Sequence, residues 1–280
     1  MNKRKSFENK VVWITGASSG IGEALALAFA ERGSKLILSA RSTEKLEALA
    51  EKCKASGSST TDAIALTLDV TDEASLAGKA KAAWFSFGQV DLLINNAGVS
   101  QRSSFLKTSM DTYRKLFEVD VFGQIALTKE VVPLMIEQGF GHVAVTSSVA
   151  GKVGAPFRTG YCAAKHAVMG FFDALRTEVA DKNVEVTTIT PGYIRTSISE
   201  NALTGDGTAF GKVDENIGKG MSAEACAQVI IRKMEKGVAE IPVGVGMEMT
   251  ALKIKRAFPN LLFKIANRMY HKAAKENDFE

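Results

Sequence analysis

The sequence predicts an α/β protein built on one doubly wound parallel sheet, with helices packed on both faces. Short runs of Val, Ile and Leu alternate along the chain with longer stretches that carry helical spacing. The short runs are nearly continuous in apolar residues, which is typical of parallel strands buried on both faces. Hydrophobic residues make up 46% and charged residues 24% of the 280 positions, the balance of an ordinary globular domain.

The expected strands and helices follow one another without a break. Strands are expected at 11–15, 35–39, 63–68, 91–95, 142–147 and 184–190. Helices are expected between them at 21–32, 43–55, 72–86, 111–138 and 158–180. Because no linker, low-complexity run or internal repeat interrupts the pattern, residues 1–250 are expected to form one domain. Within it, the glycine-rich segment 193–221 follows the sixth strand, at the sheet edge where ligands bind, and is expected to form a substrate lid.

Charge and cysteine content exclude several classes of protein. Residues 251–280 carry the whole net charge of +4, so the main body lacks the basic surface of a nucleic-acid-binding protein. The three cysteines and three histidines are scattered without ligand spacing, and no metal site is expected. No stretch approaches the ~18 apolar residues of a membrane span, and the polar first ten residues do not resemble a secretory signal. A reducing, cytoplasmic location is expected.

The first expected strand ends in a glycine-rich turn that runs directly into a helix. Its sequence, TGASSGIG at 15–22, has the spacing G-x3-G-x-G. Glycines let the backbone turn tightly and approach a diphosphate, and the free N–H groups at the positive end of the helix then receive the anion. The turn predicts a dinucleotide site made by Gly16, Ser18, Ser19, Gly20, Ile21 and Gly22.

This spacing resembles the TGxxxGxG motif of the short-chain dehydrogenase/reductase family, which has a Rossmann-type fold. Three further segments agree with that family in order and spacing: NNAG at 95–98, Tyr161-x-x-x-Lys165, and PGYIRT at 191–196. The resemblance covers about residues 10–245, and 161–207 resembles the dehydrogenase/reductase member 7B subgroup. It implies an oxidoreductase with a nicotinamide cofactor. The cofactor contacts that it implies in these segments are Asn96, Ala97, Gly98, Pro191, Gly192, Ile194 and Thr196.

The resemblance assigns catalysis to Ser148, Tyr161 and Lys165. Tyr161 and Lys165 are four residues apart on an expected helix and therefore share one face. A neighbouring ammonium favours the phenolate and lowers a tyrosine pKa that is otherwise ~10. The resemblance also places Lys165 against the nicotinamide ribose. Ser147 is the rival of Ser148, but the distance of thirteen residues to Tyr161 and the alternation of side chains along a strand select Ser148.

The end of the second expected strand favours NADP(H) over NAD(H). An acid at this place holds the ribose of NAD, whereas an Arg accommodates the 2′-phosphate of NADP. The strand ends in SAR at 39–41, without an acid, and the Arg41 guanidinium is suited to pair with phosphate. Alternatively, Arg41 is an ordinary surface charge at the start of a helix and binds no cofactor. Asp69 and Val70, after the third strand, resemble the adenine-contacting pair of the family.

One position departs from the family pattern. Members carry an Asn in the helix before the fifth strand, where it supports a water and proton relay to the lysine. This chain has Asp120 there, in the segment EVDVFG. The acid preserves hydrogen bonding but adds a negative charge near Lys165, so the relay role does not transfer. This departure leaves open a second function, that of a catalytically weak or inactive NADP(H)-binding or sensing protein.

Residues 251–280 form a basic extension with an amphipathic helix expected from Leu261. Its apolar stripe and basic flank consist of Leu261, Leu262, Ile265 and Met269, and of Lys264, Arg268 and Lys275. Such a helix can lie on an anionic membrane surface, or it can dock on residues 1–250 of its own chain or on a partner subunit. Docking is the favoured interpretation. A membrane-docking scaffold is a third function that rests on this extension alone.

Together, these features predict NADP(H)-dependent interconversion of a small-molecule carbonyl and a secondary alcohol. In this scheme Ser148 polarises the carbonyl, Tyr161 protonates the alkoxide, and Lys165 tunes Tyr161 and holds the cofactor. Peripheral membrane contact would suit a lipid-like substrate. The family resemblance implies a homodimer or homotetramer.

Overall fold

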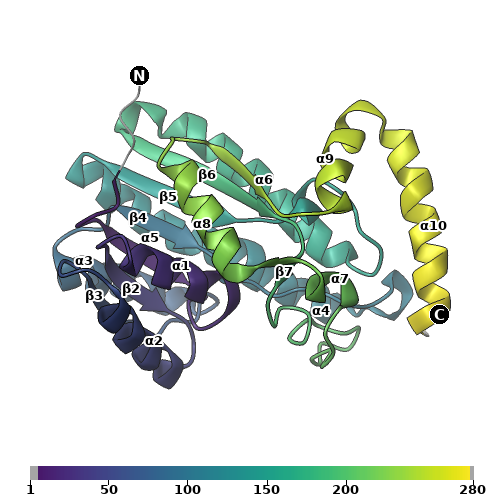
Figure 1. The fold of residues 1–280 in the computed structure, drawn as a ribbon, viewed down its shortest axis with the longest axis horizontal. Helices are drawn as coiled ribbons and strands as arrows, with labels where there is room; N and C mark the ends of the chain where they lie inside the picture. The colour runs from purple at the N-terminus through teal and green to yellow at the C-terminus, as the bar shows by residue number, and fades with distance from the viewer. Residues whose placement is uncertain (1–5, 278–280) are drawn as a thin grey trace.

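The computed structural model describes residues 6–277, and a seven-stranded parallel sheet forms its centre (Figure 1). The strand order is β3-β2-β1-β4-β5-β6-β9, so the order reverses between β1 and β4. The strands are β1 (Val11–Thr15), β2 (Lys35–Ser39), β3 (Asp62–Ala65), β4 (Leu92–Asn95), β5 (Gly141–Thr146), β6 (Val184–Pro191) and β9 (Glu240–Val243). A separate short pair is formed by β7 (Ile194–Arg195) and β8 (Met221–Ser222). This architecture confirms the predicted doubly wound α/β fold.

Helices cover both faces of the sheet (Figure 1). One layer contains α1 (Gly20–Ala30), α2 (Thr43–Ser56) and α8 (Ala223–Met234), and the other contains α3 (Glu73–Phe87), α5 (Gly123–Gln138) and α6 (Thr159–Glu178). The helices that follow strand carboxyl ends without joining these layers are α4 (Met110–Phe117), α7 (Glu215–Gly218), α9 (Met247–Ala257) and α10 (Pro259–Asn277). Short 3-10 turns occur at Phe105–Lys107, Val149–Gly151 and Ala180–Lys182.

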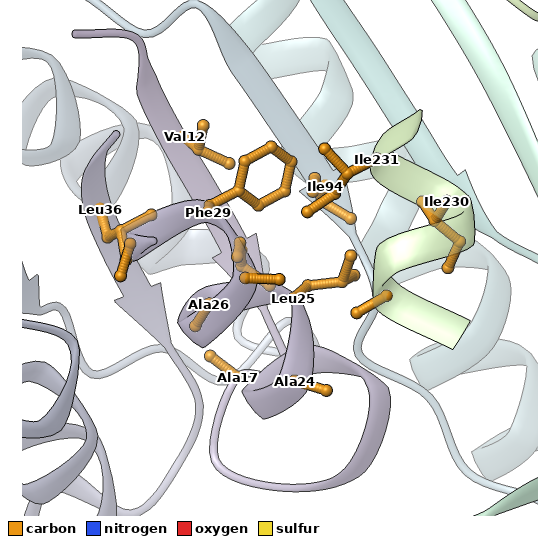
Figure 2. Close-up of a cluster of buried hydrophobic side chains, with 14 of the residues drawn as sticks. Val12, Ala17, Ala24, Leu25, Ala26, Phe29, Leu36, Ile94, Ile230 and Ile231 are labelled. Carbon is orange, nitrogen blue, oxygen red and sulfur yellow. The ribbon is translucent and has the colours of Figure 1, made fainter. Parts of the chain in front are cut away.

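Apolar packing between α1, α8 and the sheet fixes the first layer. Figure 2 shows the ring of Phe29 on α1 between Val12, Leu36 and Ile94 of three strands, with Ile231 of α8 beside it. All five side chains are fully buried. Removing a buried aromatic side chain of this kind costs about 3–5 kcal/mol. The glycine turn between β1 and α1 is therefore held between two rigid elements.

Two predicted elements differ from the structure in extent. The strand expected at 63–68 ends at Ala65, although the N–H groups of Leu66 and Leu68 still donate to carbonyls of the β2 segment, at 2.9 and 3.0 Å. The helix expected at 111–138 is interrupted by a π-helical turn at Glu118–Phe122. The wider turn accompanies a tertiary contact: buried Asp120 accepts a hydrogen bond from the loop after β4.

Helix α8 and strand β9 were not predicted. The β9 sequence is EIPV, and Pro242 weakens a strand signal because proline lacks an N–H to donate. The proline is tolerated because β9 lies at the edge of the sheet.

The C-terminal extension forms two helices rather than one. The helix expected from Leu261 begins at Pro259, and α9 precedes it, so the expected boundary after residue 250 falls inside α9. Figure 1 shows α10 standing beside the carboxyl edge of the sheet. Side chains from Lys272 onward, that of Lys275 included, lie outside the described residues. Across residues 6–277, no helix combines the length and apolar character that a membrane crossing requires.

Candidate active site

A cavity of about 1040 Å³ opens at the carboxyl edge of the sheet. Its walls come from the glycine turn after β1, the end of β2, the loops after β3 to β6, and helices α9 and α10. It lies where the strand order reverses, which is the usual ligand position in open α/β sheets. Apart from Gly22, every residue that the sequence assigned to catalysis or to the cofactor lines this cavity.

The glycine turn has no room for side chains. Gly16 and Gly20 adopt φ values of 63° and 60°, in the left-handed region that favours glycine. A Cβ on Gly16 would lie 2.8 Å from the Cα of Ala97, and one on Gly20 would lie 2.9 Å from the Cγ2 of Thr196. Gly22 does not line the cavity, but a Cβ there would collide with the carbonyl oxygen of Gly16, so glycine keeps α1 close to the turn.

Ser147 and Ser148, at the end of β5, make different contacts. The buried Ser147 hydroxyl donates to the backbone carbonyl of Lys165 at 3.0 Å and ties the strand to α6. The Ser148 Oγ accepts the Ala150 N–H at 3.1 Å and begins a 3-10 turn. Its hydroxyl donates to the carbonyl of Pro191 at 3.4 Å, and its presence beside the Tyr161 phenol lowers the pKa of that phenol. The structure therefore brings Ser148, rather than Ser147, to Tyr161.

Helix α6 presents Tyr161 and Lys165 to the cavity. Its first turn is fixed by Gln101, whose Oε1 accepts the N–H of Gly160 at 2.7 Å and the N–H of Tyr161 at 3.3 Å. The Lys165 ammonium donates to the carbonyl of Thr146 at 3.1 Å and lies 5.7 Å from the centre of the Tyr161 ring. The two side chains are thus held together by α6 and by the end of β5.

Electrostatics keep the Tyr161 phenol protonated. Burial raises the pKa of Tyr161 above its usual range, and the negative charge of Asp120 raises it further. The neighbouring Ser148 hydroxyl and the charge of Arg158 lower the pKa of Tyr161, but their effects are weaker. A protonated phenol beside an ammonium is suited to give a proton to a developing oxyanion.

Basic residues surround the far end of the cavity, at the end of β2. Arg41 is exposed and lines the cavity together with Ser42 and Lys45, which sequence reasoning missed. Lys45 follows Arg41 by four residues across the start of α2, and that spacing was the available signal. Burial raises the pKa of Asp69, but hydrogen bonds from Thr71 and the charge of Arg41 outweigh it and leave this pKa below its usual range.

The glycine-rich segment and the C-terminal extension complete the cavity wall. The expected lid 193–221 contributes Leu203 and Ile217, among others. Helix α10 contributes Leu262, Ile265, Ala266 and Met269. Three of these belong to the apolar stripe expected from the sequence, whose fourth member, Leu261, is exposed and does not line the cavity. Tyr270 of α10 stacks on Phe157 of the body, with ring centres 5.3 Å apart. Helix α10 therefore docks over the cavity.

The chain is similar to several known proteins. The model of a family described as short chain dehydrogenase matches residues 10–206. Dehydrogenase/reductase SDR family member 7B of Bos taurus is 40% identical over 279 residues, which cover 99% of this chain and 85% of the relative.

Solved structures show the same similarity. A short-chain dehydrogenase/reductase from Burkholderia phymatum in complex with NAD has a TM-score of 0.75 at 26% identity, covering 85% of this chain and 90% of that one. An alcohol dehydrogenase from the archaeon Thermococcus sibiricus, complexed with 5-hydroxy-NADP, has a TM-score of 0.71 at 28% identity, covering 84% and 96%.

Proposed function

The chain belongs to the short-chain dehydrogenase/reductase family of oxidoreductases, and we propose that it interconverts a carbonyl and a secondary alcohol with NADP(H) as cofactor. One observation carries this proposal: Ser148, Tyr161 and Lys165 meet in the wall of the same cavity onto which the glycine turn opens. The similarity to structures that hold NAD or 5-hydroxy-NADP supports a nicotinamide cofactor.

The lining of the cavity suits an extended dinucleotide. The turn at Gly16 and Gly20 leaves backbone N–H groups and the positive end of α1 for a diphosphate. Thr196 lies against Gly20 and brings the turn after β6 to the same place. Arg41 follows β2, on one side of β1, and the end of β5, which contacts Lys165, lies on the other side.

The catalytic roles follow from the contacts of the three side chains. A reduced nicotinamide, when bound, supplies a hydride to the carbonyl carbon. Ser148 donates a hydrogen bond to the carbonyl oxygen and stabilises the negative charge that develops there. Tyr161, protonated because burial raises its pKa, gives its proton to the same oxygen. Lys165 stabilises the resulting phenolate through its positive charge.

The basic end of the cavity supports NADP(H) rather than NAD(H). Arg41 and Lys45 place two positive charges beside the N-terminus of α2, where Ser42 is the first residue before the helix. No carboxylate ends β2, where an acid would bind the free ribose hydroxyl of NAD(H). Two cations at this end of the cavity would strengthen the binding of NADP(H), which carries a 2′-phosphate, more than the binding of NAD(H), which lacks it.

The wall formed by the extension supports a lipid-like carbonyl substrate. Leu262, Ile265 and Met269 of α10 line the cavity. Three other apolar residues of the extension, Phe258, Leu261 and Phe263, are 65%, 51% and 55% exposed. Because Lys264 and Arg268 are exposed on the same helix, the exposed apolar residues suit peripheral contact with an anionic membrane surface.

Flotation of the purified protein with anionic vesicles tests this contact. The protein should float with the vesicles at low salt, and its absence from the vesicle fraction would rule out the membrane contact. A cytoplasmic homodimer or homotetramer completes the proposal.

Turnover on ketones of graded chain length, with NADPH consumption and alcohol formation followed together, tests the proposed function. Replacing Tyr161 by Phe should lower kcat about 10²–10⁴-fold and leave NADPH binding nearly unchanged, because only the proton donor is lost. Tyr113→Phe is the matched control, since its hydroxyl pairs with Thr159 away from the cavity. NADPH binding without turnover on any ketone would instead favour the sensing protein.

A further inference from the structure

A buried acid lies directly behind the Lys165 ammonium. Asp120 belongs to the π-helical turn between α4 and α5 and is fully buried. Its Oδ1 accepts the N–H of Val99 at 2.8 Å. Its Oδ2 has no hydrogen-bond partner within residues 6–277, but it lies 3.8 Å from the Nζ of Lys165. The carboxylate of Asp120 and the ammonium of Lys165 thus form a buried charge pair in which one carboxylate oxygen lacks a hydrogen bond.

The surrounding backbone leaves room for this pair. A Cβ on Gly98 would lie 2.9 Å from Asp120 Oδ1 and 3.3 Å from Lys165 Nζ, so glycine is required where the two groups approach each other. The ammonium has three N–H groups. One donates to the carbonyl of Thr146 and another faces Asp120, which leaves the third for the cavity.

Resting on the proposed function, we propose that Asp120 is a positioning residue for the reaction: its carboxyl holds Lys165 from behind, and its ionisation sets how readily Tyr161 exchanges a proton. The acid does not touch the reacting atoms. It acts through Lys165, whose charge it offsets when ionised, and through its own field at the phenol.

The electrostatics of the neighbouring groups support this role. Burial raises the pKa of Asp120, and the charge of Lys165 and the Val99 N–H oppose that effect. The ionisable groups that face Asp120 are Lys165 and Tyr161, both from α6, while the loop after β4 presents the Val99 amide. Ionised Asp120 raises the pKa of Tyr161. Removing this charge should therefore lower the pKa of the phenol and favour the phenolate.

The pH dependence of turnover tests the inference. Asp120→Asn keeps the size of the side chain and an acceptor for Val99, but it removes the charge. In the alcohol-oxidation direction, where the phenolate is the base, its pH–rate profile should shift to lower pH by about one unit. Glu118→Gln is the matched control: it removes one negative charge from the same turn outside the contact with Lys165, and its profile should match wild type. Should Asp120→Asn fold poorly, Asp120→Ser also removes the charge, with a shorter side chain.

Infrared difference spectra between wild type and Asp120→Asn provide a readout that requires no turnover. The carbonyl stretch of one neutral carboxyl group should persist above the pH at which an ordinary Asp ionises, ~3.9, and should disappear before the alkaline range in which the phenolate forms and the two pH profiles are compared. Glu118→Gln should not remove it. A missing band, or a superimposable pH profile for Asp120→Asn, overturns the inference. If wild type has no turnover but the band is present and titrates, the proposed catalysis fails while the shared site of Asp120 and Lys165 stands.

Discussion

Cofactor selection at Arg41 is open to a direct quantitative test. The guanidinium is exposed at the end of β2 and is joined in the cavity wall by Lys45. A hydrogen bond to a charged group contributes about 1.5–3 kcal/mol, and exposure to water places Arg41 at the lower end of that range. Since ~1.4 kcal/mol is tenfold in affinity, Arg41→Ala should weaken NADPH binding about tenfold. The double variant Arg41→Ala, Lys45→Ala should lose about a hundredfold in NADPH affinity. The loss is smaller if both cations bind the same phosphate oxygens, because their effects are then not additive.

Fluorescence titration of each variant with NADPH and NADH separates the two cofactors. NADH binding should change less than about twofold, because it lacks the phosphate that Arg41 and Lys45 would contact. Lys54→Ala is the matched control: Lys54 lies on the same helix, nine residues beyond Lys45, and pairs with Glu51. Higher ionic strength should reduce the difference in NADPH affinity between wild type and the variants, since exposed charges are screened. Equal losses for NADPH and NADH would refute the 2′-phosphate assignment.

Further substitutions test the packing of the site. Gly98→Ala should abolish turnover, since its Cβ would come within 2.9 Å of Asp120 Oδ1; steady-state kinetics on the folded variant measure this, and unchanged kcat would contradict it. Gly78→Ala, on α3 with open space around it, should raise the free energy of unfolding in urea by about 0.5–1 kcal/mol. Gln101→Leu should lower both the free energy of unfolding and kcat, because the Gly160 N–H loses its acceptor; a change in neither would remove Gln101 from positioning α6. The double change Leu262→Ala and Ile265→Ala should raise KM for long-chain ketones more than for short ones, with NADPH affinity unchanged, and equal effects on all chain lengths would separate α10 from the substrate.

The glycine turn of the candidate site could be predicted because the rules that govern its backbone are local. A tight turn with left-handed φ values needs glycine, so the positions of Gly16 and Gly20 in the sequence report the backbone that the structure shows. Strands buried on both faces need continuous apolar runs, and those runs located six of the seven strands. Ser148 follows such a strand and therefore lies at the sheet edge, whereas Tyr161, on α6, was assigned to the same site by the resemblance to the short-chain dehydrogenase/reductase family.

Other features depend on contacts that no local pattern records. The π-helical turn accompanies the burial of Asp120 against the Val99 amide, a contact between segments about twenty residues apart. Gln101 caps α6 from a loop sixty residues away, and a lone glutamine gives no signal of such a contact. The apolar stripe on α10 was visible, but periodicity alone does not distinguish a helix that covers a cavity from one that covers a partner or a membrane.

A crystal structure with NADPH bound tests the central claim most directly. The diphosphate should lie against the turn at Gly16 and Gly20, the 2′-phosphate should contact Arg41, and the nicotinamide ring should face the hydroxyl of Tyr161. A diphosphate bound elsewhere, or a nicotinamide turned away from Tyr161, would contradict the assignment of this cavity as the oxidoreductase site.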